Sequence, residues 1–484
     1  MLAKIKKYFN LLFGKDGSVV AKATAWFLVC SVLQKALRMI TMPIFSRIMS
    51  VEEIGQYTNY TTWVEIITIL TTFRLDYGVF NKGMAKYPER RNEYTSTMIL
   101  TTSGLSLAWM VVYFLFHDFF NRITGLSTTV SIAIFAELIF TPAVWFWSLN
   151  QRYEYKYKAV VAVTIISSIV NTAVSTIAVI ACNNKVDARI FSGIIVSVLF
   201  AIVIYFICIN KSRQKFSFDI LKFAVIFNIP LIPHYFSAYI LEQSDKIMIR
   251  EMVGMKELGL YGTACSLAAT VKIITTSMSN AILPWQYEAL KEKKFEAIEK
   301  RIMTSVYLVA GMILLFICVA PEALLILASP KYIDAIMVIP PISGAVIMIF
   351  YYSLVANIEF FYDKNKFVTI VSCVCAVLNV VINYFAIQKF GYLGAAYATY
   401  ICYIIFAFAH AIYVNRIVIH KFGKRLLKIR DVVFIALVSS LVILVMSSLY
   451  NYYIIRYAIL TMLCVLILVF RKKIKHIFGM LSKG

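Results

Sequence analysis

Charged side chains inside apolar stretches are the residues of this sequence whose types could do chemistry. Lys35 and Arg38 stand three residues apart in one apolar run, which places them on one helical face, and Lys272 lies near the middle of another run. A charged side chain at the centre of a bilayer costs about 2.5–3.5 kcal/mol, so such positions are usually kept for a function. Together with Arg47, these cations would attract an anionic group, and the donor fork of arginine suits a phosphate.

Carboxylates in the same apolar stretches are candidates for ion coupling or counter-charge. Glu65 and Glu137 lie about 12 Å into their runs, counted at about 1.5 Å per residue, and Asp245 lies near an outer end. Each could bind a coupling H+ or Na+ ion, or neutralise a nearby cation. The alternative is that an internal ion pair, such as Glu65 with Lys35 or Lys272, only fixes the packing of helices.

Neither a metal centre nor a catalytic set is visible in the sequence. The nine cysteines and five histidines lack metal-ligand spacing, and His410 is expected to be a packing residue. There is no Gly-rich phosphate loop of the nucleotide-binding type, so the chain is not expected to use ATP directly. We therefore predict no cofactor and no enzymatic activity.

Membrane-spanning helices are the elements that must position these residues. Of the 484 residues, 61% are apolar and 15% are charged, against about 45–50% and about 25% in soluble proteins. Apolar stretches of about 18 or more residues recur along the chain, each long enough to cross the hydrocarbon core. We predict an all-α, polytopic integral membrane protein with about fourteen transmembrane helices. The predicted spans are 24–47, 57–80, 95–116, 128–149, 159–181, 189–210, 222–244, 260–284, 303–328, 335–361, 367–387, 392–414, 432–450 and 453–470.

The formal net charge of +23 is distributed in a way that argues against nucleic acid as a partner. Lys and Arg gather in every second connection between the predicted spans, and the intervening connections hold few of them. This alternation follows the positive-inside rule when both termini are cytoplasmic. The predicted location is therefore the cell membrane, where the excess charge faces membrane lipids.

A short motif that occurs twice divides the chain into halves. Residues 53–57 and 257–261 both read acidic–aliphatic–Gly–x–Tyr, 204 residues apart, and a second echo repeats at an offset of 208. The agreement of the two offsets indicates two pseudo-symmetric lobes of about six helices each, followed by two further helices. The predicted parts are an N-lobe at 1–210, a cytoplasmic inter-lobe linker at 211–222, a C-lobe at 223–415, and the C-terminal helices with a basic tail at 416–484.

Prolines and glycines mark the predicted hinges. Pro43 lies late in the first predicted span, and Pro230 and Pro233 interrupt the seventh. A proline inside a helix removes a backbone donor and bends the chain, and Gly55 and Gly259 give the two repeated motifs conformational freedom. In transporters such bends line cavities and let helices rock, although simple packing kinks are the alternative.

Several local patterns together resemble one family. They are Ser244-Asp245-Lys246-Ile247-Met248-Ile249 with Gly254, Glu257-Leu258-Gly259-Leu260-Tyr261, Pro284-Trp285-Gln286-Tyr287-Glu288-Ala289-Leu290, Pro321-Glu322 with Tyr332, Asn379 and Asn383 with residues 391–399, and Pro43, Arg47, Gly55 and Tyr57. In order and spacing over about residues 20–415, this set resembles the polysaccharide-transporter flippases of the multidrug/oligosaccharidyl-lipid/polysaccharide (MOP) exporter superfamily.

The resemblance implies two lobes around a central cavity that opens alternately to each side. It implies a flippase that moves polyprenyl-pyrophosphate-linked oligosaccharide repeat units from the cytoplasmic to the outer leaflet, for capsule, exopolysaccharide or O-antigen synthesis. Coupling to an ion gradient is also implied, with a polysaccharide polymerase and glycosyltransferases as candidate partners. The cationic positions Lys35, Arg38 and Lys272 suit the pyrophosphate of such a carrier.

Three other functions stay open. About fourteen spans exceed the twelve usual for O-antigen-type members and equal the number in lipid II (peptidoglycan precursor) flippases of the same superfamily. A drug-cation exporter would favour an acidic cavity, which the three intramembrane cations argue against. A membrane-embedded polymerase or glycosyltransferase would need a sizeable outer loop or a metal-binding carboxylate motif, and neither is visible in the sequence.

Overall fold

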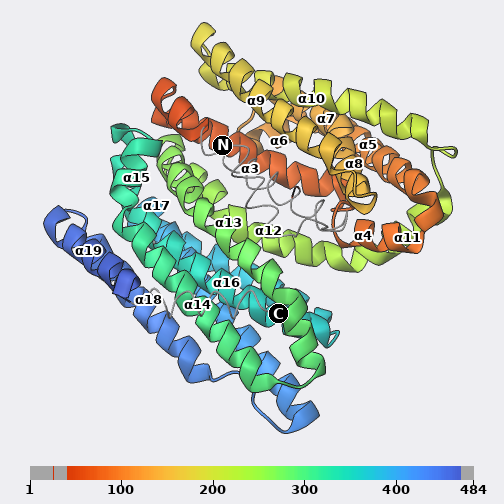
Figure 1. Ribbon diagram of the computed structural model, residues 1–484. Coiled ribbons are helices and arrows are strands. Elements are labelled where there is room, and N and C mark those ends of the chain that lie inside the picture. The colour runs from red at the N-terminus through yellow and green to blue at the C-terminus, as the bar shows by residue number, and fades with distance from the viewer. Residues whose placement is uncertain (1–25, 27–40, 470–484) are drawn as a thin grey trace, which may run out of the picture. The chain divides into compact units, whose positions relative to one another are not determined.

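The computed structural model describes residue 26 and residues 41–469 of the chain. Within these residues every regular element is a helix (Figure 1). Ten of the helices are long and apolar enough to cross a membrane. The prediction of an all-α, multi-span membrane protein is therefore confirmed for the described part of the chain.

The number of helices is consistent with about fourteen spans. α17 (Asn365–Phe422) joins two predicted spans in one helical run that is broken at Gly391, where φ is 59° and ψ is −149°. α3 (Val51–Thr72) and α19 (Tyr453–Val469) occupy two further predicted spans. Most of the first predicted span lies outside the described residues, so the count of fourteen stays a prediction.

One compact unit, unit 1, comprises Met1–Met49 and Asn59–Ile232. Besides most of α3, its elements are α4 (Gly78–Lys86), η1 (Pro88–Arg90), α5 (Arg91–Leu115), α6 (His117–Thr124), α7 (Thr128–Phe140), α8 (Pro142–Tyr153), α9 (Tyr157–Ala181), α10 (Lys185–Lys211), α11 (Phe218–Asn228) and η2 (Ile229–Leu231). In its core the ring of Phe80 packs on those of Tyr94 and Phe146, with centroids 5.4 and 5.1 Å apart. Gly83 makes room for this packing, because a Cβ there would lie 2.0 Å from the Tyr94 ring.

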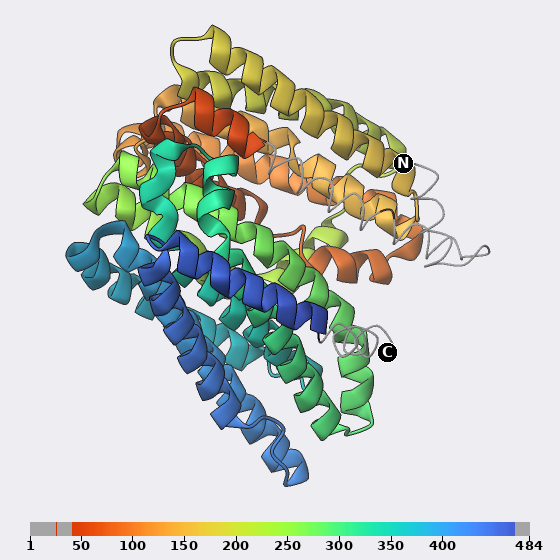
Figure 2. The same ribbon diagram turned by 60° about the vertical axis from the view of Figure 1, so that its left-hand side comes forward.

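The second compact unit, unit 2, comprises Ser50–Thr58 and Pro233–Gly484. Its elements are the first turns of α3, then α12 (Ile232–Met252), α13 (Met255–Lys291), α14 (Phe295–Cys318), α15 (Ala320–Leu327), η3 (Pro330–Val338), α16 (Ile339–Phe361), α17, α18 (Ile429–Leu449) and α19. α16 lies deepest in unit 2, and its Phe350, Tyr351 and Leu354 are buried. α18 and α19 diverge from the short connection between them (Figure 2).

The two copies of the repeated motif pack against each other within unit 2. A Cβ added to Gly55 of α3 would lie 1.8 Å from the carbonyl oxygen of Met255. A Cβ added to Gly259 of α13 would lie 2.0 Å from the carbonyl oxygen of Val51. The two helices therefore approach backbone to backbone, which only residues without a side chain allow.

Each copy of the motif also begins a helix in a way that suits its sequence. Ser50 and Glu53 form a capping box at the start of α3: the Ser50 N–H donates to the Glu53 carboxylate at 2.6 Å, and the Glu53 N–H donates to the Ser50 hydroxyl at 3.1 Å. At the equivalent place before α13 stands Gly254, whose φ of 142° a residue with a side chain rarely adopts. The repeat seen in the sequence thus corresponds to two matching helix starts.

The boundary between the compact units does not coincide with the predicted inter-lobe linker. The units meet along the chain between Ile232 and Pro233, at the start of α12, whereas the linker was expected at 211–222. Residues 211–222 and α11 belong to unit 1. The predicted lobes themselves stay a prediction.

Candidate functional site

Two of the four cations predicted to bind an anion lie in the described part of the chain; Lys35 and Arg38 lie outside it. Arg47 is exposed, and its Nη1 donates to the Pro43 carbonyl oxygen at 2.8 Å. Lys272 of α13 forms an ion pair with Glu242 of α12, and their side chains are 38% and 49% exposed. Lys272 therefore has an acidic partner that the sequence analysis did not assign to it.

The carboxylates predicted in the first half of the chain have different environments. Glu65 lies at an exposed position on α3, whereas Glu137 of α7 is more enclosed and interacts with the hydroxyl group of Ser197. Arg74 and Asp76, close to each other in the sequence, form an ion pair at 3.7 Å. A role of Glu65 and Glu137 in ion coupling or as counter-charge stays a prediction.

Asp245 is the most deeply buried of the predicted carboxylates. It is 5% exposed on α12, and it accepts hydrogen bonds from the hydroxyl of Tyr261 and, at 2.8 Å, from the backbone N–H of Lys246. Tyr261 is the last residue of the repeated motif on α13, so the motif supplies a partner for this carboxylate as well as the glycine contact.

Polar side chains of α17 continue this buried region. Asn379 accepts through Oδ1 from the Ser244 hydroxyl and from Asn383 Nδ2, both at 2.9 Å. Asn383 Oδ1 and Asn379 Nδ2 are buried without a hydrogen-bond partner. An unpaired oxygen of this kind is a ligand that hard cations take from proteins. Among the described residues, no group of three or more His, Cys, Asp and Glu could hold a metal ion.

The predicted hinge residues lie at helix breaks and at a close crossing. Pro43 lies in a helix at 41–48, Pro230 lies in the short η2, and Pro233 is the second residue of α12. η2 separates α11 from α12 and immediately precedes the boundary between the compact units. Gly55 and Gly259 form the close crossing of α3 and α13. Movement at any of these positions stays a prediction.

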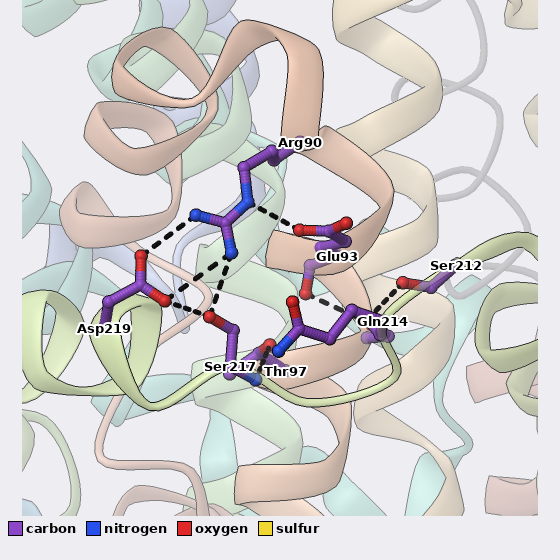
Figure 3. A network of polar contacts seen from close by, with 8 residues as sticks. Arg90, Glu93, Thr97, Ser212, Gln214, Ser217 and Asp219 are labelled. Carbon is purple, nitrogen blue, oxygen red and sulfur yellow. Dashed lines mark hydrogen bonds and ion pairs between the residues drawn. The ribbon is translucent and has the colours of Figure 1, made fainter.

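A polar network that the sequence analysis missed holds the connection between α10 and α11 (Figure 3). The Arg90 guanidinium donates to Asp219 and to the Ser217 hydroxyl, each at 3.0 Å. It also donates to Glu93 at 2.5 Å, and the Ser217 N–H donates to Thr97 Oγ1 at 3.2 Å. The connection is thereby tied to the start of α5. Hydropathy carries no signal for this network, because its partners are up to 129 residues apart.

A second ion pair that the sequence analysis missed attaches the last described helix. Arg456 of α19 is 3% exposed and donates to both carboxylate oxygens of Glu322 in α15, each at 2.6 Å. It also donates to the Cys318 carbonyl oxygen at 2.7 Å. This bidentate contact binds α19 to α14 and α15 within unit 2.

An apolar cavity of about 180 Å³ lies among α14, α16 and α18 of unit 2. Tyr307, Leu314, Gly344, Phe434 and Ile443 are among the residues that line it. Its lining is almost wholly apolar, so it suits a hydrocarbon chain and not a sugar or a phosphate.

Long apolar helices, with ionisable and polar groups enclosed between them, define a multi-span membrane protein. A family described as "Polysaccharide biosynthesis protein" matches residues 20–290, and the chain belongs to this family. Lsg locus putative protein 1 of Haemophilus influenzae is 24% identical over 385 residues, 75% of this chain and 89% of that protein. An uncharacterized membrane protein of the same organism is 23% identical over 402 residues, 80% of this chain and 92% of that protein.

Solved structures share the fold. Lipid II flippase MurJ in an inward closed conformation matches with a TM-score of 0.71 and 13% identity, over 93% of this chain and 99% of that one. An inward-facing multidrug resistance MATE family transporter of the MOP superfamily matches with a TM-score of 0.65 and 13% identity, over 83% of this chain and 100% of that one. The fold is therefore of the MOP-exporter type, as the motifs predicted.

Proposed function

We propose that this protein is a flippase that moves polyprenyl-pyrophosphate-linked oligosaccharide repeat units from the cytoplasmic to the outer leaflet of the cell membrane, for capsule, exopolysaccharide or O-antigen synthesis. The observation that carries the proposal is a transporter fold in a chain of a polysaccharide biosynthesis family. Sugar hydroxyls and a diphosphate cannot cross hydrocarbon without polar partners, so such a lipid needs a protein route. Both termini are cytoplasmic in this proposal.

The pyrophosphate is bound by the intramembrane cations. Lys35, Arg38, Arg47 and Lys272 are each proposed to contact the pyrophosphate during transport, and at Lys272 the pyrophosphate displaces Glu242. The partial exposure of both members of the Lys272–Glu242 pair supports access by a ligand. The apolar cavity among α14, α16 and α18 accepts part of the polyprenyl chain, since its lining offers a hydrocarbon surface.

Transport is coupled to a cation gradient, H+ or Na+, with Asp245 as the principal carboxylate. The buried, unpaired Oδ1 of Asn383, which is linked through Asn379 to Ser244 beside Asp245, supports cation binding there. No other cofactor takes part, and the protein is not an enzyme.

Reconstitution tests the proposal. Purified protein in proteoliposomes with a fluorescent polyprenyl-pyrophosphate oligosaccharide is expected to expose the inner-leaflet label to an impermeant quencher. Arg38→Ala and Lys272→Ala each remove a charged contact worth about 1.5–3 kcal/mol, so we expect about tenfold or greater loss of flipping with normal insertion and stability. Lys256→Ala is the matched control, because Lys256 is exposed at the start of the same helix as Lys272. Full flipping by both alanine variants would remove Arg38 and Lys272 from the site.

Lipid II is the second candidate substrate, favoured by the TM-score of 0.71 with a lipid II flippase. Rescue of cells depleted of their lipid II flippase would assign this substrate, and failure to rescue, with flipping of the oligosaccharide lipid in proteoliposomes, would assign the first. Longer glycan chains after incubation of the purified protein with lipid-linked repeat units would instead reveal a polymerase.

A further inference from the structure

A fully buried histidine–carboxylate pair lies inside unit 2, apart from the residues assigned above. Nδ1 of His410, on α17, lies 2.9 and 2.8 Å from the two carboxylate oxygens of Glu359, on α16. Both side chains are 0% exposed. His410 is therefore more than the packing residue that the sequence analysis expected, because it holds a carboxylate that has no contact with solvent.

Aromatic rings surround the imidazole of His410. The centroids of Phe406, Tyr352 and Phe367 lie 4.6, 4.7 and 5.8 Å from that of His410. The second imidazole nitrogen, Nε2, is buried and has no hydrogen-bond partner. Burial of a polar atom without a partner costs free energy, so Nε2 is the unsatisfied side of a ring whose other nitrogen holds the carboxylate.

A second histidine extends the cluster. His234, near the start of α12, has a buried Nδ1 without a hydrogen-bond partner, and His410 is the ionisable group that acts on it electrostatically. Among the described residues, His234 from α12 and Tyr352 from α16 are titratable groups that face the pair. Among the described residues, His410 is also the ionisable group that acts on Glu359, and no lysine or arginine does so.

As far as the described residues go, the charge of this cluster changes only when a proton binds or leaves. With one proton shared between the Glu359 carboxylate and the His410 imidazole, the pair carries a net charge of −1, and with a second proton it is neutral. A buried net charge is costly in low dielectric surroundings. Uptake of a proton removes that cost, and the added proton binds as an N–H or O–H bond without any other bond changing.

We propose that Glu359 and His410 form a proton-binding site of unit 2 that takes up one proton in each transport cycle. The inference rests on the proposed flippase function, and it adds a proton site separate from the carboxylate of Asp245. The pair joins α16 to α17, so a change in its protonation acts directly on the packing of these two helices. His234 at the start of α12 is the next group able to receive the proton.

Imidazole 15N spectra of the purified protein test the site without any transport assay. The chain has five histidines, so the His410 signals can be assigned from their loss in His410→Asn. We expect the His410 ring to change protonation state as the pH of the sample is varied, and Glu359→Gln, which removes the carboxylate that holds Nδ1, to alter that response. His420→Asn is the matched control, because His420 is exposed near the end of the same helix. A His410 ring that keeps one protonation state as the pH is varied would overturn the proposal.

Flipping in proteoliposomes links the site to transport. The rate for wild-type protein is expected to change about tenfold per pH unit on the limb where proton binding limits it, and Glu359→Gln and His410→Asn are expected to flatten that dependence. If both variants fold and keep the wild-type pH profile, the inference fails while the flippase function stands. If the His410 ring titrates as expected but no oligosaccharide lipid is flipped at any pH, the site stands and the proposed function fails.

Discussion

Gly55→Ala tests the close crossing of α3 and α13. The added Cβ would lie 1.8 Å from the Met255 carbonyl oxygen, whereas ordinary contact begins at 3.4 Å, so the two backbones must separate locally by about 1.6 Å. Overpacking of this kind costs about 1–3 kcal/mol, and the contact with rigid backbone places this case near the upper end. The gain in helix propensity from Gly to Ala offsets about 1 kcal/mol, so we expect a net loss of about 2 kcal/mol.

The matched control for Gly55→Ala is Gly311→Ala. Gly311 lies inside α14, also in unit 2, and a Cβ there would meet nothing within 4 Å. It should therefore show the propensity gain alone, which leaves the two variants about 3 kcal/mol apart. Titration with SDS in mixed micelles, followed by tryptophan fluorescence or circular dichroism, measures the free energy of unfolding for both proteins.

The double variant Gly55→Ala/Gly259→Ala makes the test sharper. Once the helices have separated to admit the first Cβ, the second should cost less, so the double loss should fall short of the sum of the single losses by about 1 kcal/mol. Equal stability of Gly55→Ala and Gly311→Ala, or full additivity of the two crossing variants, would show that the backbones are not in close contact at this crossing.

Three further predictions concern polar contacts. Arg90→Ala should speed tryptic cleavage of residues 212–217, whereas Arg91→Ala should not, because Arg91 donates to the Met84 carbonyl oxygen instead. Unchanged cleavage in SDS-PAGE time courses would contradict this prediction. Arg456→Met should lower the free energy of unfolding by about 2 kcal/mol, because it leaves the Glu322 carboxylate with the Tyr457 hydroxyl but without a cationic partner. Arg430→Met, which removes an 81% exposed side chain, should change the free energy of unfolding by under about 0.5 kcal/mol. Equal losses in the two variants would show that the Arg456–Glu322 contact does not stabilise the protein. Asp245→Asn should abolish the dependence of flipping on a cation gradient while leaving the Glu359–His410 titration in place, and retained gradient dependence would exclude Asp245 from coupling.

The helical architecture could be predicted because it depends on local properties of the sequence. A membrane span needs a continuous apolar stretch, and the paired backbone groups of a helix need no distant partner. The repeated motif predicted related positions in the two halves, but not that Gly55 and Gly259 touch. Contact between two glycines depends on the path of both helices, which a single sequence does not reveal.

The candidate sites could be predicted only in part. Charges in apolar runs drew attention to Lys272 and Asp245, because burial of a charge is costly at any such position, whereas His410 was expected only to pack. Their partners depend on how helices pack: Glu359 and His410 are 51 residues apart, and Lys272 and Glu242 are 30 apart. Neither the separation of two residues in the sequence nor the hydropathy around them indicates that they will pair.

The break in α17 at Gly391 makes a very short turn, because helix continues directly on both sides of it. A Cβ on Gly394 would lie 2.1 Å from the Ala386 carbonyl oxygen, so the turn is also tightly packed. By contrast, residues 182–184 between α9 and α10 are non-helical and exposed. Epitope insertion is therefore expected to be tolerated at 182–184 and to disrupt the protein at 388–392. An antibody against an epitope at 182–184 would then report on which side of the membrane the connection between α9 and α10 lies.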